Sequence, residues 1–376
     1  MDDEQPIGDA KARLADSSLT IVQALVQRVQ AVLAWLDRVD PGTHRRIKGL
    51  RLVTAYGLAA ALGALQDVTQ SVPAGVSVGA LAGGFALWAS VSEARTTRFE
   101  SSRDLVILCV AAAFGAFTFT FFAPMLRETG RGGAELILVT GAFLAGYLKR
   151  FGMTGAGVGS QLYIGQLLAY GMDLRPGDSW AILLALLIGM LAAIVPRVLS
   201  GPAEHPVVLP ALASEPAYGR DAISPAFAMG LQAACGALVV VALNRLFGLA
   251  ESAWAITACV YVVATSAVGT AERVRRRIYG TLVGVPIGIV CLPLAEHWPL
   301  VVWILSAFAM IAYAMALPER YDIACGAFAF VLIVTLAASG VHSLELLTAR
   351  AWETLLGGAL GLIASRVIFP LRVVRA

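Results

Sequence analysis

The chain has 376 residues, of which 58% are hydrophobic and only 14% are charged. Soluble globular chains carry about 25% charged residues, so this composition excludes an ordinary soluble enzyme and indicates a membrane protein. The formal net charge is +3, and we attribute the excess of Lys and Arg to their role in setting the orientation of membrane helices. No nucleic-acid partner is expected.

Residues 1–47 are predicted to form a cytoplasmic arm. Apolar residues recur there with helical spacing at Ile21, Leu25, Val29, Val32 and Leu36. This periodicity predicts an amphipathic helix over 17–39. Trp35, Arg28 and Arg38 suit a helix lying at the cytoplasmic membrane interface. Docking against a partner subunit is the alternative.

Twelve apolar segments follow, and each is long enough to cross the roughly 20-residue hydrocarbon layer. They lie near 50–68, 73–92, 104–125, 133–148, 153–171, 179–199, 225–248, 253–270, 277–296, 299–317, 322–340 and 346–369. The predicted fold class is therefore an all-α polytopic membrane protein with about 12 transmembrane helices, embedded in a lipid bilayer.

The distribution of Lys and Arg predicts the orientation, because positive residues stay on the cytoplasmic side. With both termini inside, 23 of the 28 basic residues fall on the cytoplasmic side. The outer side keeps only Arg127, Arg131, Arg175, Arg245 and Arg350. A missed or false helix would mix the two sets, so we expect an even number of crossings and N-in, C-in topology.

A Pro-rich cytoplasmic linker at 201–221 divides the helices into two six-helix units, 48–200 and 222–370, and 371–376 is a short tail. The units share features: basic residues precede the fifth span of each, at 149–150 and at Arg320, and a basic cluster follows each second span. We therefore predict an internal repeat, with a substrate site near the midplane where the repeats meet.

Small residues are frequent in the spans and predict close helix contacts in lipid. The alternative is that some helices break around a solute, and the strongest candidates are 152–159, Pro286 and Pro293. The five cysteines all fall inside apolar spans and are expected to be small buried hydrophobic residues.

Motifs for chemistry on bound cofactors are missing from the sequence. No GxxxxGK phosphate loop occurs, so the chain has no ATPase of its own. The four histidines lie apart, without an HExxH pattern or a His/Cys cluster. We expect neither a metal, nor another cofactor, nor catalytic residues, and the protein is not expected to be an enzyme.

The second half resembles a known family. Four segments show the resemblance: 252–257 with Trp254 near the helix start, the basic loop 270–277, the R-x-x-G-T-x-x-G pattern at 277–284, and 350–358 followed by Phe369-Pro370. These segments look like the fusaric acid resistance family. The resemblance is good over about residues 222–370, and the first half of the chain resembles the family only in outline. The resemblance implies a relative of aromatic acid exporters and, more distantly, of plant malate channels.

The resemblance implies an inner-membrane, multi-pass secondary transporter that exports organic carboxylic acids, with aromatic acids as the expected class. A small organic anion would then be its ligand. Many members use a periplasmic adaptor, and a homo-oligomer is the other partner left open. Large cytoplasmic helical domains common in the family do not fit within 197–221 or 371–376. A gated organic-anion channel and a membrane accessory protein without transport are the alternatives.

Arg350 and Glu353 are the main candidate substrate-binding pair. Three residues apart on a helix, they share a face and are expected to neutralise each other. Charges inside a span usually mark an interior cavity. Arg350 would attract a carboxylate and Glu353 would hold or release a proton. A structural ion pair near the outer interface is the alternative.

Seven more residues are candidates for substrate binding: Arg277, Gln161, Tyr163, Gln166, Trp254, Thr257 and Tyr261. Arg277 begins the ninth span, as a cytoplasmic anchor or as a group that captures substrate. The amides and phenol of the fifth span suit either hydrogen bonds between helices or a cavity for an aromatic acid. Trp254, Thr257 and Tyr261 share one face, with an interfacial aromatic belt as the alternative for Trp254.

Overall fold

The structure is a computed structural model, and it consists of two units, Met1–Arg46 and Ile47–Ala376. It describes residues 43–70, 72, 76–95, 97–200, 224–317, 319–338 and 344–371, together with scattered residues between 23 and 40. The predicted amphipathic helix over 17–39, the linker at 201–221 and most of the tail at 371–376 lie largely outside the described residues, so these remain predictions.

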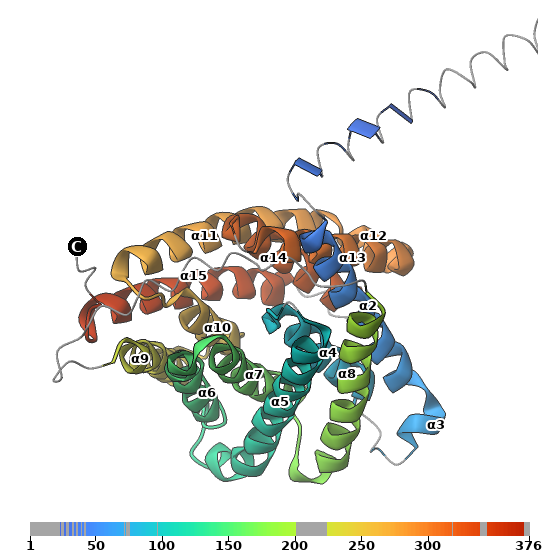
Figure 1. Cartoon of the computed structure of the whole chain (residues 1–376). Coiled ribbons are helices and arrows are strands. Elements are labelled where there is room, and N and C mark those ends of the chain that lie inside the picture. Colours follow the sequence, from blue (N-terminus) through green and yellow to red (C-terminus); the bar gives the residue numbers. More distant parts are fainter. Residues whose placement is uncertain are drawn as a thin grey trace, which may run out of the picture. The chain divides into compact units, whose positions relative to one another are not determined.

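Every regular element among the described residues of Ile47–Ala376 is helical (Figure 1). In the first half these are α2 (His44–Ala64), α3 (Gln66–Thr69), α4 (Val78–Ser92), α5 (Arg98–Arg127), α6 (Leu136–Tyr147), η1 (Leu148–Phe151), α7 (Gly152–Gly171), η2 (Pro176–Asp178) and α8 (Ser179–Leu199). In the second half they are α9 (Pro225–Phe247), α10 (Ser252–Val262), α11 (Ala267–Val290), α12 (Leu292–His297), α13 (Pro299–Ala316), α14 (Tyr321–Ala338) and α15 (Leu344–Val367).

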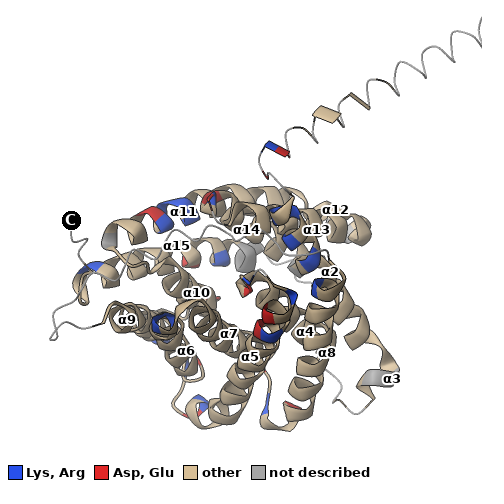
Figure 2. Cartoon of the chain, in the orientation of Figure 1, with Lys and Arg blue, Asp and Glu red and all other residues tan. Residues whose placement is uncertain are grey.

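Several of these helices have the length and apolar composition of membrane-spanning helices, so the chain is a membrane protein. Among the described residues, five helical stretches are long and apolar enough to cross a membrane: Arg98–Arg127, Leu136–Gly171, Pro176–Leu199, Pro225–Phe247 and Pro299–Ala316. Shorter apolar helices accompany them. Figure 2 shows long helical stretches without charge, with Lys and Arg gathered near helix ends and on the first part of α11. Each predicted span overlaps a helix, although α10 covers only the first part of the eighth span. The number of crossings and their orientation remain predictions.

The start of α11 differs from the sequence prediction. The eighth span was expected to reach residue 270, but α10 ends at Val262 and α11 already begins at Ala267. The Ser266 hydroxyl accepts a hydrogen bond from the Gly269 N–H at 3.0 Å and so caps the new helix. Arg277 therefore lies ten residues into a helix instead of at the mouth of a span.

The predicted helix breaks are found at only one place. Helix α7 runs without interruption from Gly152 to Gly171, and α11 continues through Pro286. The chain breaks at Cys291, directly before the short helix that carries Pro293 near its start. Proline is tolerated in the first helical turn because its missing N–H is not needed there.

Four helix pairings recur at corresponding positions in the two halves. Helix α5 packs on α7 and α8, α4 on α8, and α6 on α7. In the second half, α11 packs on α14 and α15, α10 on α15, and α13 on α14. Counted along the twelve predicted spans, these are the same four pairings. Helix α6 packs on α9 and joins the halves. That the halves arose by duplication remains a prediction.

Glycine permits the closest of these contacts. A methyl group on Gly115 or Gly165 would collide with the backbone of the facing helix in the α5–α7 pair. The corresponding pair α11–α14 has the same design, since a methyl group on Gly284 would collide with the Gly326 carbonyl oxygen. In lipid, where hydrophobic burial does not drive helices together, such backbone approach is a principal source of packing energy.

Candidate functional site

A cavity of about 1290 Å³ lies between helices of both halves. It exceeds the roughly 300–1,000 Å³ of a typical small-molecule pocket. Its lining on α11 extends from Gly269 to Val285, about 24 Å at the rise of an α-helix. At the predicted outer end the lining includes Met172 and Asp173. The cavity therefore approaches both ends of the bundle.

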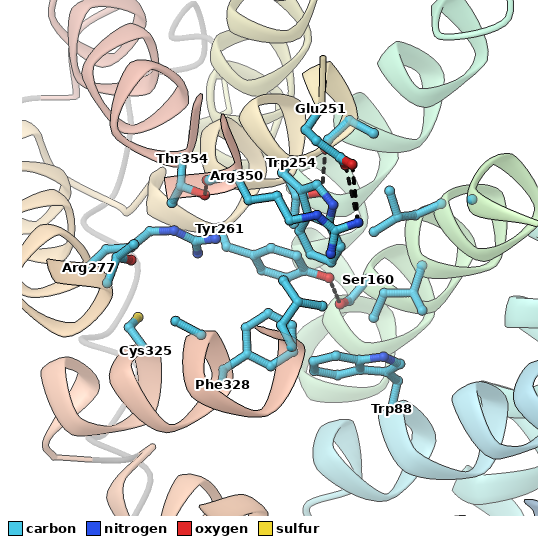
Figure 3. A pocket seen from close by; sticks show the side chains of 18 of the residues that line it. Trp88, Ser160, Glu251, Trp254, Tyr261, Arg277, Cys325, Phe328, Arg350 and Thr354 are labelled. Atoms are coloured by element: carbon cyan, nitrogen blue, oxygen red, sulfur yellow. Dashed lines mark hydrogen bonds and ion pairs between the residues drawn. The ribbon is translucent and has the colours of Figure 1, made fainter. Parts of the chain in front are cut away.

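Five arginines line this cavity, and Figure 3 shows the side chains of two of them, Arg277 of α11 and Arg350 of α15. Arg350 lies on α15, and its Nη2 forms an ion pair with the Glu251 carboxylate at 3.3 Å. Its guanidinium carbon lies 5.1 Å from the centre of the Trp254 ring, within cation–π range. Its Nε and Nη1 are buried and have no hydrogen-bond partner among the described residues. Two charged donors are thus left to a ligand.

Arg277 is the second cationic group. Its Nη1 lies 3.4 Å from the Tyr321 hydroxyl, a long and weak hydrogen bond, and its Nε is buried without a partner in the described part of the chain. No carboxylate among the described residues forms an ion pair with it. A buried cation without a counter-ion is costly, and an anion bound in the cavity would reduce that cost.

Two neighbouring basic residues of α11, Arg275 and Arg276, are neutralised locally. Glu272 forms ion pairs with Arg276 at 2.6 Å and with Arg275 at 2.9 Å. Hydrogen bonds from these two guanidinium groups lower the pKa of Glu272, which precedes the predicted span. Glu272 therefore stays ionised and compensates Arg275 and Arg276. Arg273 donates to the Val263 carbonyl, and like Arg277 it forms no ion pair with a described carboxylate.

Aromatic rings form one wall of the cavity. The Trp88 ring of α4 meets the Phe328 ring of α14 at a centroid distance of 5.5 Å and an interplanar angle of 67°. Trp254 and Tyr313 also lie near Phe328, at 6.3 Å and 6.2 Å. Such edge and tilted arrangements leave ring faces and edges available to another aromatic group.

Hydroxyl groups cross the boundary between the two halves next to this wall. Ser160 of α7 and Tyr261 of α10 share a hydrogen bond at 2.9 Å (Figure 3). Tyr163 and Thr257 are 2.7 Å apart, and the Thr257 hydroxyl donates to the Ala253 carbonyl, so the Tyr163 hydroxyl is the donor of this pair. Tyr163 itself is fully buried behind the lining.

Five of the nine residues predicted from sequence line the cavity: Arg350, Arg277, Trp254, Thr257 and Tyr261. The other four, Glu353, Gln161, Tyr163 and Gln166, are buried outside the lining. The Gln161 amide donates to the Trp88 carbonyl and to Ser92, and the Gln166 amide donates to Thr118 and Thr140. Both amides thus join helices, and a part in substrate binding remains a prediction for all nine residues.

The expected partner of Arg350 is different in the structure. Glu353 shares its helix face, but both Glu353 oxygens accept the backbone N–H of Glu251, at 3.1 and 3.0 Å. The ion pair of Arg350 is formed instead with the Glu251 side chain. The reason is that the turn before α10 brings a carboxylate to Arg350 and an N–H to Glu353.

Sequence reasoning missed several lining residues, chiefly Trp88, Glu251, Tyr313 and Phe328. Glu251 directly precedes the segment that contains Trp254, so an acidic residue next to a candidate site was an available signal. The three aromatic residues have no local signal, because aromatic side chains within apolar spans are also common facing lipid or neighbouring helices.

In a comparison with protein families, residues 237–364 match the family described as fusaric acid resistance protein-like. The matched segment extends from within α9 to within α15 and so carries Glu251, Trp254, Arg277 and Arg350. Comparisons with curated proteins and with solved structures gave no match.

Proposed function

We propose, from the match of residues 237–364 to fusaric acid resistance protein-like proteins, that this membrane protein transports organic carboxylates, with aromatic acids as the preferred class. The inner membrane is its proposed location. The observation that carries the proposal is Arg277, a cation without a carboxylate partner among the described residues, beside an aromatic wall in a large cavity.

The carboxylate of such a substrate would bind the free guanidinium donors. Arg277 has its Nε available, and Arg350 has Nε and Nη1 available. Guanidinium groups present parallel N–H donors that match the two oxygens of a carboxylate. The Arg350 pair with Glu251 would compete with the substrate at this second position.

The ring of an aromatic acid would lie against the wall formed by Trp88, Trp254 and Phe328. Ring contacts of this kind contribute about 0.5–1.5 kcal/mol beyond burial alone. One such molecule fills only part of a cavity of 1290 Å³, so the remaining space suits movement of the substrate along α11.

The energy source we propose is an ion gradient, since the sequence holds no phosphate-binding loop. A gated anion channel is the second candidate. It is favoured by the extent of the cavity, whose lining includes Asp173 near the predicted outer end and Leu317 near the predicted cytoplasmic end.

The test is benzoate flux into proteoliposomes that contain the full chain. We expect benzoate to accumulate when a proton gradient is imposed with the membrane voltage clamped at zero. Flux that follows voltage alone and ignores the proton gradient would identify a channel. Flux no greater than in empty liposomes, for benzoate and a panel of other aromatic acids, would overturn transport and favour an accessory protein.

A further inference from the structure

A buried carboxylate lies beside the cavity without a cation to balance it. Glu135 precedes α6, is only 3% exposed, and forms no ion pair with any described Lys or Arg. Its Oε1 accepts three hydrogen bonds, from the Tyr170 hydroxyl at 3.0 Å, the Asn244 amide at 2.7 Å and the Ser252 hydroxyl at 2.5 Å. The donors come from α7, α9 and α10.

The second carboxylate oxygen of Glu135, Oε2, differs from Oε1 in its hydrogen bonding. Oε2 is buried and has no hydrogen-bond partner among the described residues. A charged carboxylate in this position bears a desolvation cost that the three hydrogen bonds to Oε1 reduce, but that no described cation offsets through an ion pair. A proton on Oε2 removes the charge and leaves all three hydrogen bonds to Oε1 in place. Oε2 is therefore the position on Glu135 where a proton would bind.

Glu353, expected from sequence to carry a proton, has different contacts, and its role remains a prediction. Both of its oxygens already accept the Glu251 N–H. Glu135 thus has the free oxygen that Glu353 does not have.

Short links connect Glu135 with the cavity. Tyr170, which donates to Glu135, lines the cavity, and Ser252 directly follows Glu251, which pairs with Arg350. The charged and titratable groups that surround the site are Arg131 on the loop before α6, Tyr170 on α7, Arg245 on α9, Glu251 before α10, and Arg350 and Glu353 on α15. The Arg245 side chain donates from Nε to the Arg131 carbonyl and from Nη2 to the Thr129 hydroxyl.

We infer that Glu135 is a proton-binding site coupled to the anion cavity. The proton comes from the aqueous phase and forms an O–H bond on Oε2. Loss of the negative charge then strengthens anion binding beside Arg350, and anion binding in turn favours the proton, because coupling between two sites is reciprocal. The inference rests on the proposed function for the anion, and it names the residue through which a proton gradient would act.

The first test measures benzoate affinity of the full chain in nanodiscs at about pH 5 and about pH 8. We expect the wild type to bind roughly tenfold more tightly at the acid pH, the size of one nearby charge in a partly screened site. Glu135→Gln places a neutral amide where the protonated acid would be, so its affinity should be acid-like at both pH values. Glu128→Gln, an exposed residue at the same end of the bundle, is the matched control and should keep the wild-type difference. An unchanged pH difference in Glu135→Gln would overturn the inference.

The second test needs no anion and covers the case in which Glu135→Gln does not fold. Infrared difference spectra of the wild type between the same two pH values should show a protonated carboxyl band. Tyr170→Phe should shift the frequency of that band, because it removes one hydrogen bond to Oε1. Absence of the band in the wild type, or a band that Tyr170→Phe leaves unchanged, would contradict the assignment. A band of the expected behaviour together with no benzoate binding would overturn the proposed substrate and leave the proton site standing.

Discussion

At the scale of single residues, Arg277 differs from the other basic residues of α11 in its surroundings. Arg275 and Arg276 share the Glu272 carboxylate, whereas Arg277 meets a tyrosine hydroxyl and the cavity. The sequence shows four basic residues at positions 273 and 275–277 without distinguishing them. Only the helical rotation of about 100° per residue, combined with the packing of α11 on α14, brings Arg277 opposite Tyr321 and leaves Arg275 out of the cavity lining.

We predict that Arg277→Gln weakens benzoate binding by about ten- to a hundredfold, the effect of losing a charged hydrogen-bond donor. Arg275→Gln on the same helix is the matched control, since its side chain is 65% exposed and pairs only with Glu272 among the described residues. Binding is measured by titration of the purified proteins. Equal losses in both variants would show that the overall positive charge, and not the position of Arg277, is responsible.

Glu251 gives the opposite prediction, because it competes with an anion for Arg350. Glu251→Gln should strengthen benzoate binding by roughly threefold, a modest effect since the pair is partly exposed and screened. The backbone N–H that Glu353 accepts is retained in this variant. Weaker binding in Glu251→Gln at an unchanged melting temperature would mean that the ion pair holds Arg350 in place for the ligand.

At the scale of helices, the pairing of the third and fifth predicted spans depends on glycine in both halves. Helices α5 and α7 meet at Gly115 and Gly165, and α11 and α14 meet at Gly280, Gly284 and Gly326. The sequence predicted such contact faces from its small residues, but not which faces meet. The α11–α14 contact also positions Arg277 opposite Tyr321, so packing and the candidate site are connected.

Gly284→Ala should therefore destabilise the protein, because the added methyl group collides with the Gly326 carbonyl and overpacking costs about 1–3 kcal/mol. A lower thermal unfolding temperature in detergent is the expected readout. Gly57→Ala in α2 is the matched control, since a methyl group there meets open space and should leave the unfolding temperature unchanged or slightly raised. Similar unfolding temperatures for both variants would disprove the tight contact.

At the scale of the whole molecule, the predicted N-in, C-in topology assigns opposite sides to two exposed positions of the bundle. Asp173 follows α7 and is predicted outside, whereas Arg275 lies near the start of α11 and is predicted inside. The native cysteines Cys109, Cys259 and Cys325 are buried and give little background labelling.

With the remaining cysteines replaced, a cysteine at position 173 should react with a membrane-impermeant maleimide added to spheroplasts. A cysteine at position 275 should react only after the membrane is opened. Labelling is read by mass shift of the purified chain. Equal labelling of both positions from outside would contradict the alternation of charge on which the twelve-span prediction depends.

The sequence alone determined which segments are helical and that lipid surrounds many of them, because apolar length and the placement of basic residues are local properties of the chain. The tertiary structure decided the partners of the polar side chains: Arg350 with Glu251, Gln161 and Gln166 between helices, and Glu135 with donors from three helices. These contacts join residues 26 to 117 positions apart. Their geometry depends on how helices pack, which periodicity within one helix does not specify.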